Sequence, residues 1–370
     1  MKNLLVIAVA LASVNAFATR ARVNSLGNSV HLTDANNVYT NPADMFIVGG
    51  DYVVLESGNT KSTATSGVSN YDGAEGMVVR SMGDAKMGLA IGHDSELGLK
   101  IRSLALANFG AAVNYFQQNP LELSYGMKSG DLSWAGTLIY SNYQSKTGIN
   151  EKENTMGVRF GMHTGNYDAS LGLGLANTYQ NDTNGKFTGT LGLTAAGGMW
   201  MDTIYLKGKI ETAGYKVESA AGAEVAKVSG NTLTISATDS RKKDGNEFFY
   251  GAGLTSYSQK DDAGTQVKVD KLSLPVIIGF EQKANTWMTL RGSVTQTVLI
   301  NNSKVSTSTA TVTEASPDAN NVVVAVGTGF NFDKVNVDAT LKGLTTSAGS
   351  ANQQLDGNNL LAQVGLNYMF

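Results

Sequence analysis

Residues that could do chemistry together at one site are scarce in this chain of 370 residues. It contains three histidines, His31, His93 and His163, and no cysteine. The sequence has no G-x-S-x-G nucleophile motif, no H-E-x-x-H zinc motif and no phosphate-binding glycine loop. A hydrolase would also need a base beside an activated serine. We therefore expect a protein that is not an enzyme, with no catalytic residue, no metal and no other cofactor.

Charged residues inside alternating stretches offer a different chemistry. Lys207, Lys209 and Glu211, for example, share one face of a period-2 ribbon, opposite Leu206 and Ile210. Such charges could line a water-filled passage and select solutes, with a slight preference for anions. Alternatively, they could pair with one another across a plugged cavity and conduct nothing. The charged residues that alternation places on the polar face are Lys86, Glu122, Arg159, Lys207, Lys209, Glu211, Glu281, Arg291, Asp338 and Lys342.

Alternating stretches of about 8 to 13 residues follow one another from Asp51 onward, which is the length that a tilted strand needs to cross a bilayer. In the stretch 168–179, Ala169, Leu171 and Leu173 share one face, and small or polar residues occupy the other. Apolar outward and small or polar inward is the pattern of a transmembrane barrel, although alternation alone does not say which face is outside. A charge that faces lipid near the midplane would cost about 2 to 4 kcal/mol, so the charged residues should point inward.

The connections between these stretches alternate in length. Long polar loops lie between short turns, which we expect at Gly83-Asp84, 129–131, 164–166, Gly197-Gly198, 283–285 and Asp333-Lys334. Short turns on one side and long loops on the other are typical of outer-membrane barrels. Counting gives an odd number of strands unless Asn231–Ser240 also forms one, with a turn after it. Because a bacterial barrel of one chain has an even number of strands, we predict about 16, with 14 as the alternative.

Aromatic residues fit the same interpretation, because tyrosine and tryptophan collect at membrane interfaces. Trp134, Trp200 and Trp287 lie near predicted short turns, and Tyr179 and Tyr215 lie near the opposite strand ends. We expect two aromatic girdles, although Trp287 faces away from Met288 and Leu290 by alternation, so not every aromatic residue fits. The loop 94–120 contains a stretch, 103–116, that is long enough for a short amphipathic helix.

The two ends of the chain indicate export and insertion. Lys2, an apolar run from Leu4 to Val14 and the sequence Ala16-Phe17-Ala18 form the pattern of a secretory signal cut before Thr19. Neither this run nor any later stretch is long enough for a membrane-spanning helix. The last eleven residues alternate and end at Tyr368 and Phe370. This end resembles the terminal strand by which outer-membrane barrels are recognised and closed by the assembly machinery.

Residues 19–50 have no sustained period, and we expect them to form an irregular segment inside the barrel. Within them stands Asn41-Pro42-Ala43. The motif resembles the start of the FadL-type transporters of hydrophobic compounds, in which a segment ending in N-P-A lies in the barrel as a hatch. Asp44 departs from that family, which often has glycine there. Alternatively, Asn41 and Pro42 form an ordinary turn in a segment that merely fills space.

These patterns together predict an all-β protein. We expect a signal peptide over 1–18, a plug or hatch over 19–50, and one single-chain antiparallel transmembrane β-barrel over 51–370. The formal charge of -3 and the pI of about 5.7 give no sign of nucleic-acid binding. The expected partners are outer-membrane lipid, small solutes or a hydrophobic ligand, and the barrel-assembly machinery, and homo-oligomers are compatible with this interpretation. Three hypotheses remain: a porin-like channel for small solutes, a FadL-type transporter, or a structural surface barrel.

Overall fold

The computed structural model describes residues 19–60, 73–95, 117, 119–146, 150–182, 185–262, 267–299, 303–307, 311–314, 322–344 and 361–370. The expected signal peptide and the expected loop helix over 103–116 lie outside these residues. No helix of the described chain is long and apolar enough to cross a membrane.

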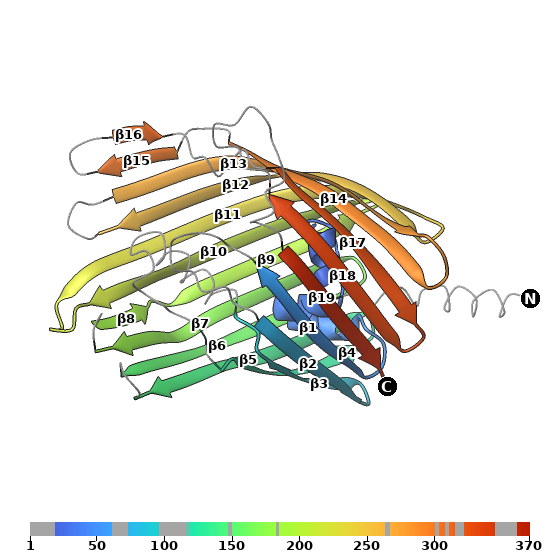
Figure 1. Ribbon diagram of the computed structural model, residues 1–370, viewed down its shortest axis with the longest axis horizontal. Helices are drawn as coiled ribbons and strands as arrows, with labels where there is room; N and C mark the ends of the chain where they lie inside the picture. The colour runs from blue at the N-terminus through green and yellow to red at the C-terminus, as the bar shows by residue number, and fades with distance from the viewer. Residues whose placement is uncertain are drawn as a thin grey trace, which may run out of the picture.

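One antiparallel sheet forms the wall of the molecule and closes on itself where β1 pairs with β19 (Figure 1). Its elements are β1 (Tyr52–Thr60), β2 (Gly73–Met82), β3 (Ala85–Ile91), β4 (Leu121–Ser129), β5 (Leu132–Ser145), β6 (Glu151–His163), β7 (Tyr167–Asn181), β8 (Gly185–Gly189), β9 (Gly192–Met201), β10 (Ile204–Glu218), β11 (Glu224–Lys243), β12 (Asn246–Asp261), β13 (Val267–Lys283), β14 (Met288–Leu299), β15 (Ser303–Thr307), β16 (Thr311–Glu314), β17 (Val322–Phe332), β18 (Val335–Leu344) and β19 (Leu361–Met369).

The wall has 16 strands, because three of them are each divided into two elements. β8 and β9 both pair with β7 and with β10, and β14 and β15 both pair with β13. β16 pairs with β15 as β17 pairs with β14. The predicted barrel of 16 strands is confirmed, and β11 includes the doubtful stretch 231–240. The alternative of 14 strands is wrong.

Both ends of the wall meet at the rim of short turns, since the Phe370 amide donates to the Asp51 carbonyl at 3.2 Å. One predicted turn is wrong: Gly197-Gly198 lies inside β9, and the chain turns instead at Asp202 and Thr203. Asp202, Asp244 and Asp333 each occupy the left-handed backbone region, with φ between 52° and 60°. Aspartate tolerates this conformation better than most residues, and it suits the tight hairpins of this rim.

An apolar band faces outward around the barrel. Ile235 and Ile278 expose 59% and 57% of their surface. Their neighbours Ser236 and Gly279 face inward, and Gly279 lies against the ring of Phe249. Towards the long-loop rim the outward residues become polar, as in β11, where Leu233 is followed by Asn231, Ser229 and Lys227. Trp134 is exposed as expected for a girdle, and Trp287 is exposed as well, although alternation sets it apart from Met288 and Leu290. Trp200, Tyr179 and Tyr215 face inward. Their assignment to the girdles is wrong.

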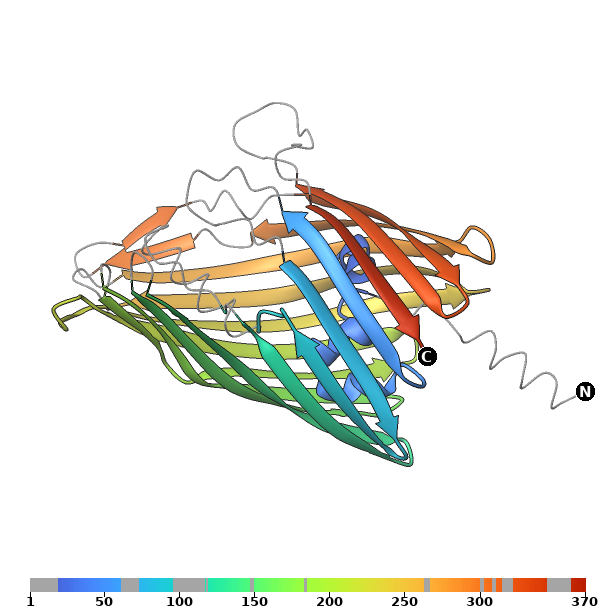
Figure 2. The same ribbon diagram turned by 60° about the horizontal axis from the view of Figure 1, so that its bottom comes forward.

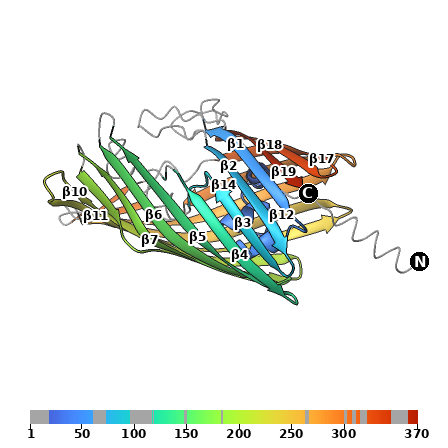
Figure 3. The same ribbon diagram turned by 90° about the horizontal axis from the view of Figure 1, so that it is seen from below.

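Residues 19–50, called here the N-terminal segment, lie inside the barrel (Figure 2; Figure 3). They form α2 (Arg20–Ser25) and two short 3-10 helices, η1 (Ala35–Tyr39) and η2 (Pro42–Phe46). α2 packs against β14, β17, β18 and β19, and η2 packs against β3 to β6. The largest buried apolar cluster joins the segment to β1, β2, β3 and β5, and includes Tyr39, Met45, Tyr52 and Val79.

The outward band can be tested by placing one charge on each side of the wall. Ile235→Arg should lower the free energy of unfolding in detergent or lipid by about 2 to 4 kcal/mol, because the guanidinium would face acyl chains. Ser236→Arg, one residue away on the lumen side, should cost far less. Equal losses for the two variants, measured by denaturant unfolding, would contradict the assignment of faces.

Candidate functional site: the lumen and its N-terminal segment

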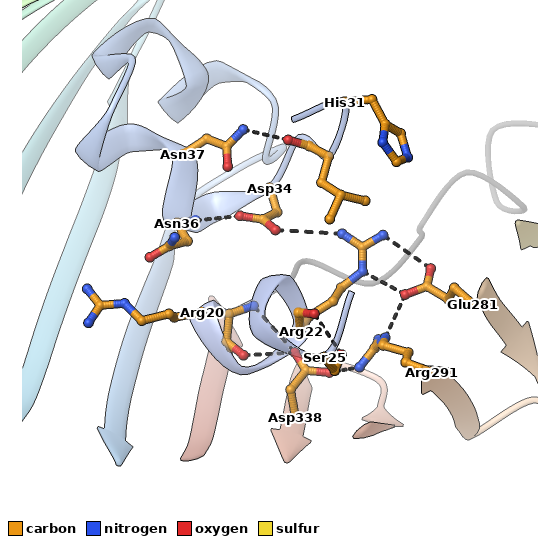
Figure 4. Close-up of polar contacts among 12 residues, drawn as sticks. Arg20, Arg22, Ser25, His31, Asp34, Asn36, Asn37, Glu281, Arg291 and Asp338 are labelled. Atoms are coloured by element: carbon orange, nitrogen blue, oxygen red, sulfur yellow. Dashed lines mark hydrogen bonds and ion pairs between the residues drawn. The ribbon is translucent and has the colours of Figure 1, made fainter. Parts of the chain in front are cut away.

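A network of buried charges joins α2 to the wall (Figure 4). Arg22 lies between two carboxylates: its Nε donates to Glu281 at 2.7 Å, and its Nη1 lies 3.6 Å from Asp34. Arg291 donates to the same Glu281 at 2.6 Å and to Asp338 at 2.5 Å. Buried charges are tolerated only when paired and hydrogen-bonded, so this network holds α2 in one position against β13, β14 and β18.

A second group of charges surrounds Arg20 on the other side of α2. Its backbone N–H donates to Glu56 on β1, and its guanidinium donates to Glu75 on β2 at 2.6 Å. His93 lies 2.9 Å from Glu75, and its ring stacks on Tyr39 of η1 with centroids 3.7 Å apart. β1 and β2 therefore bind α2, and His93, which follows β3, binds η1.

The Asn41-Pro42-Ala43 motif fixes η2 to the wall. The Asn41 side-chain oxygen caps η2 by accepting the Ala43 N–H at 3.1 Å, and its amide donates to the Met162 carbonyl at 3.0 Å. Pro42 occupies the first turn of η2, where its missing N–H costs nothing. On β6, a side chain at Gly161 would collide with Asn41. The motif thus forms a cap and also a contact with the wall.

Asp44, where the FadL family often has glycine, is buried and lies 3.2 Å from Nδ1 of His163 at the end of β6. Burial raises the pKa of Asp44, and the contact with His163 lowers it. His163 is therefore a partner of the N-terminal segment.

Lys86 holds the end of the N-terminal segment. Its ammonium donates to the carbonyls of Met45 at 3.1 Å, Val48 at 2.6 Å and Gly50 at 3.0 Å. The Lys86 ammonium also lies over the rings of Phe46 and Tyr52, 5.7 Å from each ring centroid. All three protons of the ammonium have acceptors, so this predicted lumen charge contacts the segment itself.

Ser29, His31 and Glu247 form a chain of hydrogen bonds of the kind that activates a nucleophile. His31 lies 2.9 Å from the Ser29 hydroxyl and 2.8 Å from Glu247 on β12, and Ser240 also donates to Glu247. Ser29 and His31 are both buried, and His31 packs on Phe249. A substrate has no access to the hydroxyl in this arrangement. The chain of bonds links the segment to β11 and β12.

The remaining predicted lumen charges occupy three separate places. Glu122 and Arg159 form a buried pair at 2.9 Å across β4 and β6. Lys209 and Glu211 on β10 lie 3.4 Å apart and are partly accessible, as is Lys207. Lys342 faces the lumen from β18. The ten residues therefore do not form one site. The sequence analysis does not identify five further charged residues of the lumen, Arg20, Arg22, Asp34, Glu56 and Glu75. The alternation in β1 and β2 contains a signal for Glu56 and Glu75.

A cavity of about 950 Å³ opens at the short-turn rim, beside the network of Arg22, Glu281, Arg291 and Asp338. Arg22, Glu281, Arg291 and Asp338 lie at its inner end, and the turns that follow β11, β13 and β17 form its edge. Most of the residues that line it are charged or polar. Among the described residues, no group of three or more histidines and acids is placed to hold a metal ion.

The opposite end of the lumen carries an apolar cluster. Phe187 on β8 stacks on Tyr215 of β10, with ring centroids 4.7 Å apart, and Val217, Val228 and Tyr179 pack around them. Tyr179 faces inward because β7 carries one extra residue, Leu175, opposite the bond between Met156 and Gly157. Such a bulge reverses the faces of every residue that follows it.

Asp34 gives the lumen network a dependence on pH. Burial raises the pKa of Asp34 from 3.8 to about 7, even though Arg22 lowers it. Between these two values the folded protein keeps a proton that the unfolded chain has lost, so stability should fall as the pH rises from about 4 to 7. We expect a loss on the order of 2 to 4 kcal/mol, measured as the free energy of unfolding.

Asp34→Asn is the matched control, because it keeps the oxygen that accepts the Asn36 N–H. The difference between the natural protein and this variant should change across the window from pH 4 to 7 and be constant above it. A difference that stays constant throughout would contradict the assignment to Asp34.

No protein-family model and no curated protein matches this chain. Among solved structures, it is similar to CdiB from Acinetobacter baumannii at 9% identity and a TM-score of 0.46, covering 87% of this chain and 60% of that one. It is similar to the Pseudomonas putida toluene transporter TodX at 12% identity and a TM-score of 0.40, covering 95% and 98%. It is similar to a porin at 8% identity and a TM-score of 0.41, covering 86% of this chain and 99% of the porin chain. The closed antiparallel sheet of 16 strands with its outward apolar band has the architecture of a transmembrane β-barrel.

Proposed function

We propose that this protein is an outer-membrane channel for small polar solutes, with a lumen narrowed by the N-terminal segment. The observation that carries the proposal is the contrast between the two sides of the lumen. Inward side chains of β1 to β6 and of β18 are mostly buried, in large part against the segment. Inward residues in the middle of β10 and β11, such as Lys207, Lys209 and Thr234, are partly accessible to water although they face away from lipid, whereas inward residues nearer the ends of these strands are buried.

The accessible side has the composition of a passage. Thr232, Thr234 and Ser236 on β11 are small and polar, and the inward residues of β9 include Ala196. Small side chains leave room for water. Lys207, Lys209 and Glu211 project from β10 into that space and give it two positive charges and one negative. This is the arrangement by which charged side chains select ions and small solutes in a pore.

The segment acts in this proposal as a hatch that limits the size of what can pass. It is fastened by Lys86, by Asn41 and by the charges around Arg20 and Arg22, from strands on opposite sides of the barrel. Breaking one fastening leaves the others in place, so the segment should stay in the lumen during transport. The solute therefore passes beside it, along β9 to β11.

A FadL-type transporter of hydrophobic compounds is the second candidate. The apolar cluster of Phe187, Tyr215 and Val217 faces inward at the long-loop end, where a hydrophobic compound arriving from outside would enter. The Asn41-Pro42-Ala43 cap of η2 also suits a hatch of that family. The accessible charges on β10 favour the channel.

The remaining expectations belong to the same proposal. Tyr368 and Phe370 are exposed outward and their rings stack with centroids 6.1 Å apart, which suits recognition of the last strand by the barrel-assembly machinery. We further propose that residues 1–18 direct export and are removed.

Lys207 should set the ion selectivity of the channel. In planar bilayers, Lys207→Glu should shift the reversal potential in a salt gradient towards cations, because it replaces a positive charge in the passage by a negative one. Lys152→Glu makes the same change on the outward face of β6 and should leave the potential unchanged. A natural protein that gives no conductance, together with saturable binding of a fatty acid or detergent, would favour the second candidate instead.

Deleting residues 19–48 should raise the single-channel conductance severalfold, because the segment occupies much of the lumen cross-section. Heat-modifiable mobility on gels would show that the deleted protein still forms a barrel. Lys86→Met, which removes one fastening, should leave the mean conductance near that of the natural protein and increase its fluctuations. Unchanged conductance after the deletion would contradict the role of the segment as a hatch.

A further inference from the structure

Thr19 occupies a closely packed position against the wall, between Asp338 and Gly365, which is called here its seat. It is completely buried, and both its backbone nitrogen and its hydroxyl lie close to one oxygen of Asp338, at 3.4 and 3.1 Å. Its side chain packs against Gly365 of β19, where any Cβ would collide with it. The next nitrogen along the chain, that of Arg20, donates to Glu56. The wall therefore places a carboxylate at each of the first two nitrogens of this region.

The charges around this seat are unequal. Arg22 and Arg291 face three acids, Glu281, Asp338 and Asp34. In the neighbouring group, Arg20 faces both Glu56 and Glu75, and His93 lies against Glu75. Burying a negative charge without a partner is costly. Above about pH 7, where the buried Asp34 loses its proton, the two cations in the described part of the first network face three negative charges.

We propose that cleavage between Ala18 and Thr19 supplies this cation, so that the new amino terminus binds Asp338 as an ammonium and becomes a fastening of the N-terminal segment. Hydrolysis of the peptide bond gives the hydroxyl of water to the Ala18 carbonyl and a proton to the Thr19 nitrogen, which takes another proton from solvent at neutral pH. The nitrogen that donates one neutral bond in the uncut chain then carries three protons and a positive charge. Three cations face three acids.

This inference rests on the expected signal cleavage and is independent of the solute. As a consequence, removal of the signal peptide completes the charge network of the lumen. The uncut chain, or a chain extended by a single residue, cannot place a positive charge at Asp338. The seat at Gly365 fixes the position of Thr19, so the charge must lie on that residue and on no other.

The test compares the chain that begins at Thr19 with the same chain carrying one extra alanine before it, both refolded in detergent. The extension should lower the ratio of folded to unfolded protein about tenfold, the usual size of a hydrogen bond to a charged group. In an Asp338→Asn background the extension should have little further effect. In an Asp202→Asn background, which changes a residue of the turn between β9 and β10 that does not line the cavity beside Asp338, the full effect should persist. Equal effects in all three backgrounds would overturn the proposal.

A second measurement needs no substitution at Asp338. The protein isolated from outer membranes should begin with Thr19-Arg20-Ala21 on amino-terminal sequencing. Its α-amine should react with an acylating reagent at neutral pH far more slowly in the folded protein than in the unfolded one. A different first residue, or an amine that reacts equally fast in both states, would overturn the proposal, whereas the presence or absence of conductance bears only on the channel.

Discussion

The requirement that every backbone N–H and C=O within lipid be bonded inside the protein determines the rest of this structure. Only a closed sheet satisfies it with strands, and here the pairing of β1 with β19 closes the ring. Closure leaves an outer face in contact with lipid and an inner face that lines the lumen. The outward face must be apolar, and the inward face is free to carry the polar and charged residues that the chain places in its strands. The lumen, and any function in it, follows from that separation.

The N-terminal segment that fills the lumen must also be held in place. The N-terminal segment is too short and irregular to form a core of its own, and it is held by contacts that the wall provides. Glycines at 161, 327 and 365 leave space for Asn41, Ser25 and Thr19. Charged residues from opposite strands then pair with Arg20 and Arg22. Barrel and segment are therefore complementary in shape and in charge, and most of the wall charges on the β1 to β6 side and on β13 to β18 serve this fit.

Much of the barrel could be predicted from the sequence, because a period of two and short polar turns are local features. The errors arose where a residue serves a distant partner. The pair Gly197-Gly198 has the composition of a turn, but a side chain at Gly198 would collide with the Tyr205 hydroxyl, so the glycine permits close packing inside a straight strand. Alternation places Tyr179 on the wrong face, because a pattern of alternation does not reveal the bulge at Leu175. The pairing of Arg22 with Glu281, 259 residues away, has no local signal at all.

The strands also differ greatly in length around the ring. β11 runs over 20 residues and β3 over 7, so the wall stands tall on one side and low on the other (Figure 1). The outward side chains of the tall side turn polar well before the strand ends, at Asn231 and Ser229, which places the upper part of β11 above the acyl chains. In the described part of the chain, the strand ends on the long-loop side are therefore uneven, and β11 extends farther beyond the apolar band than β3 does.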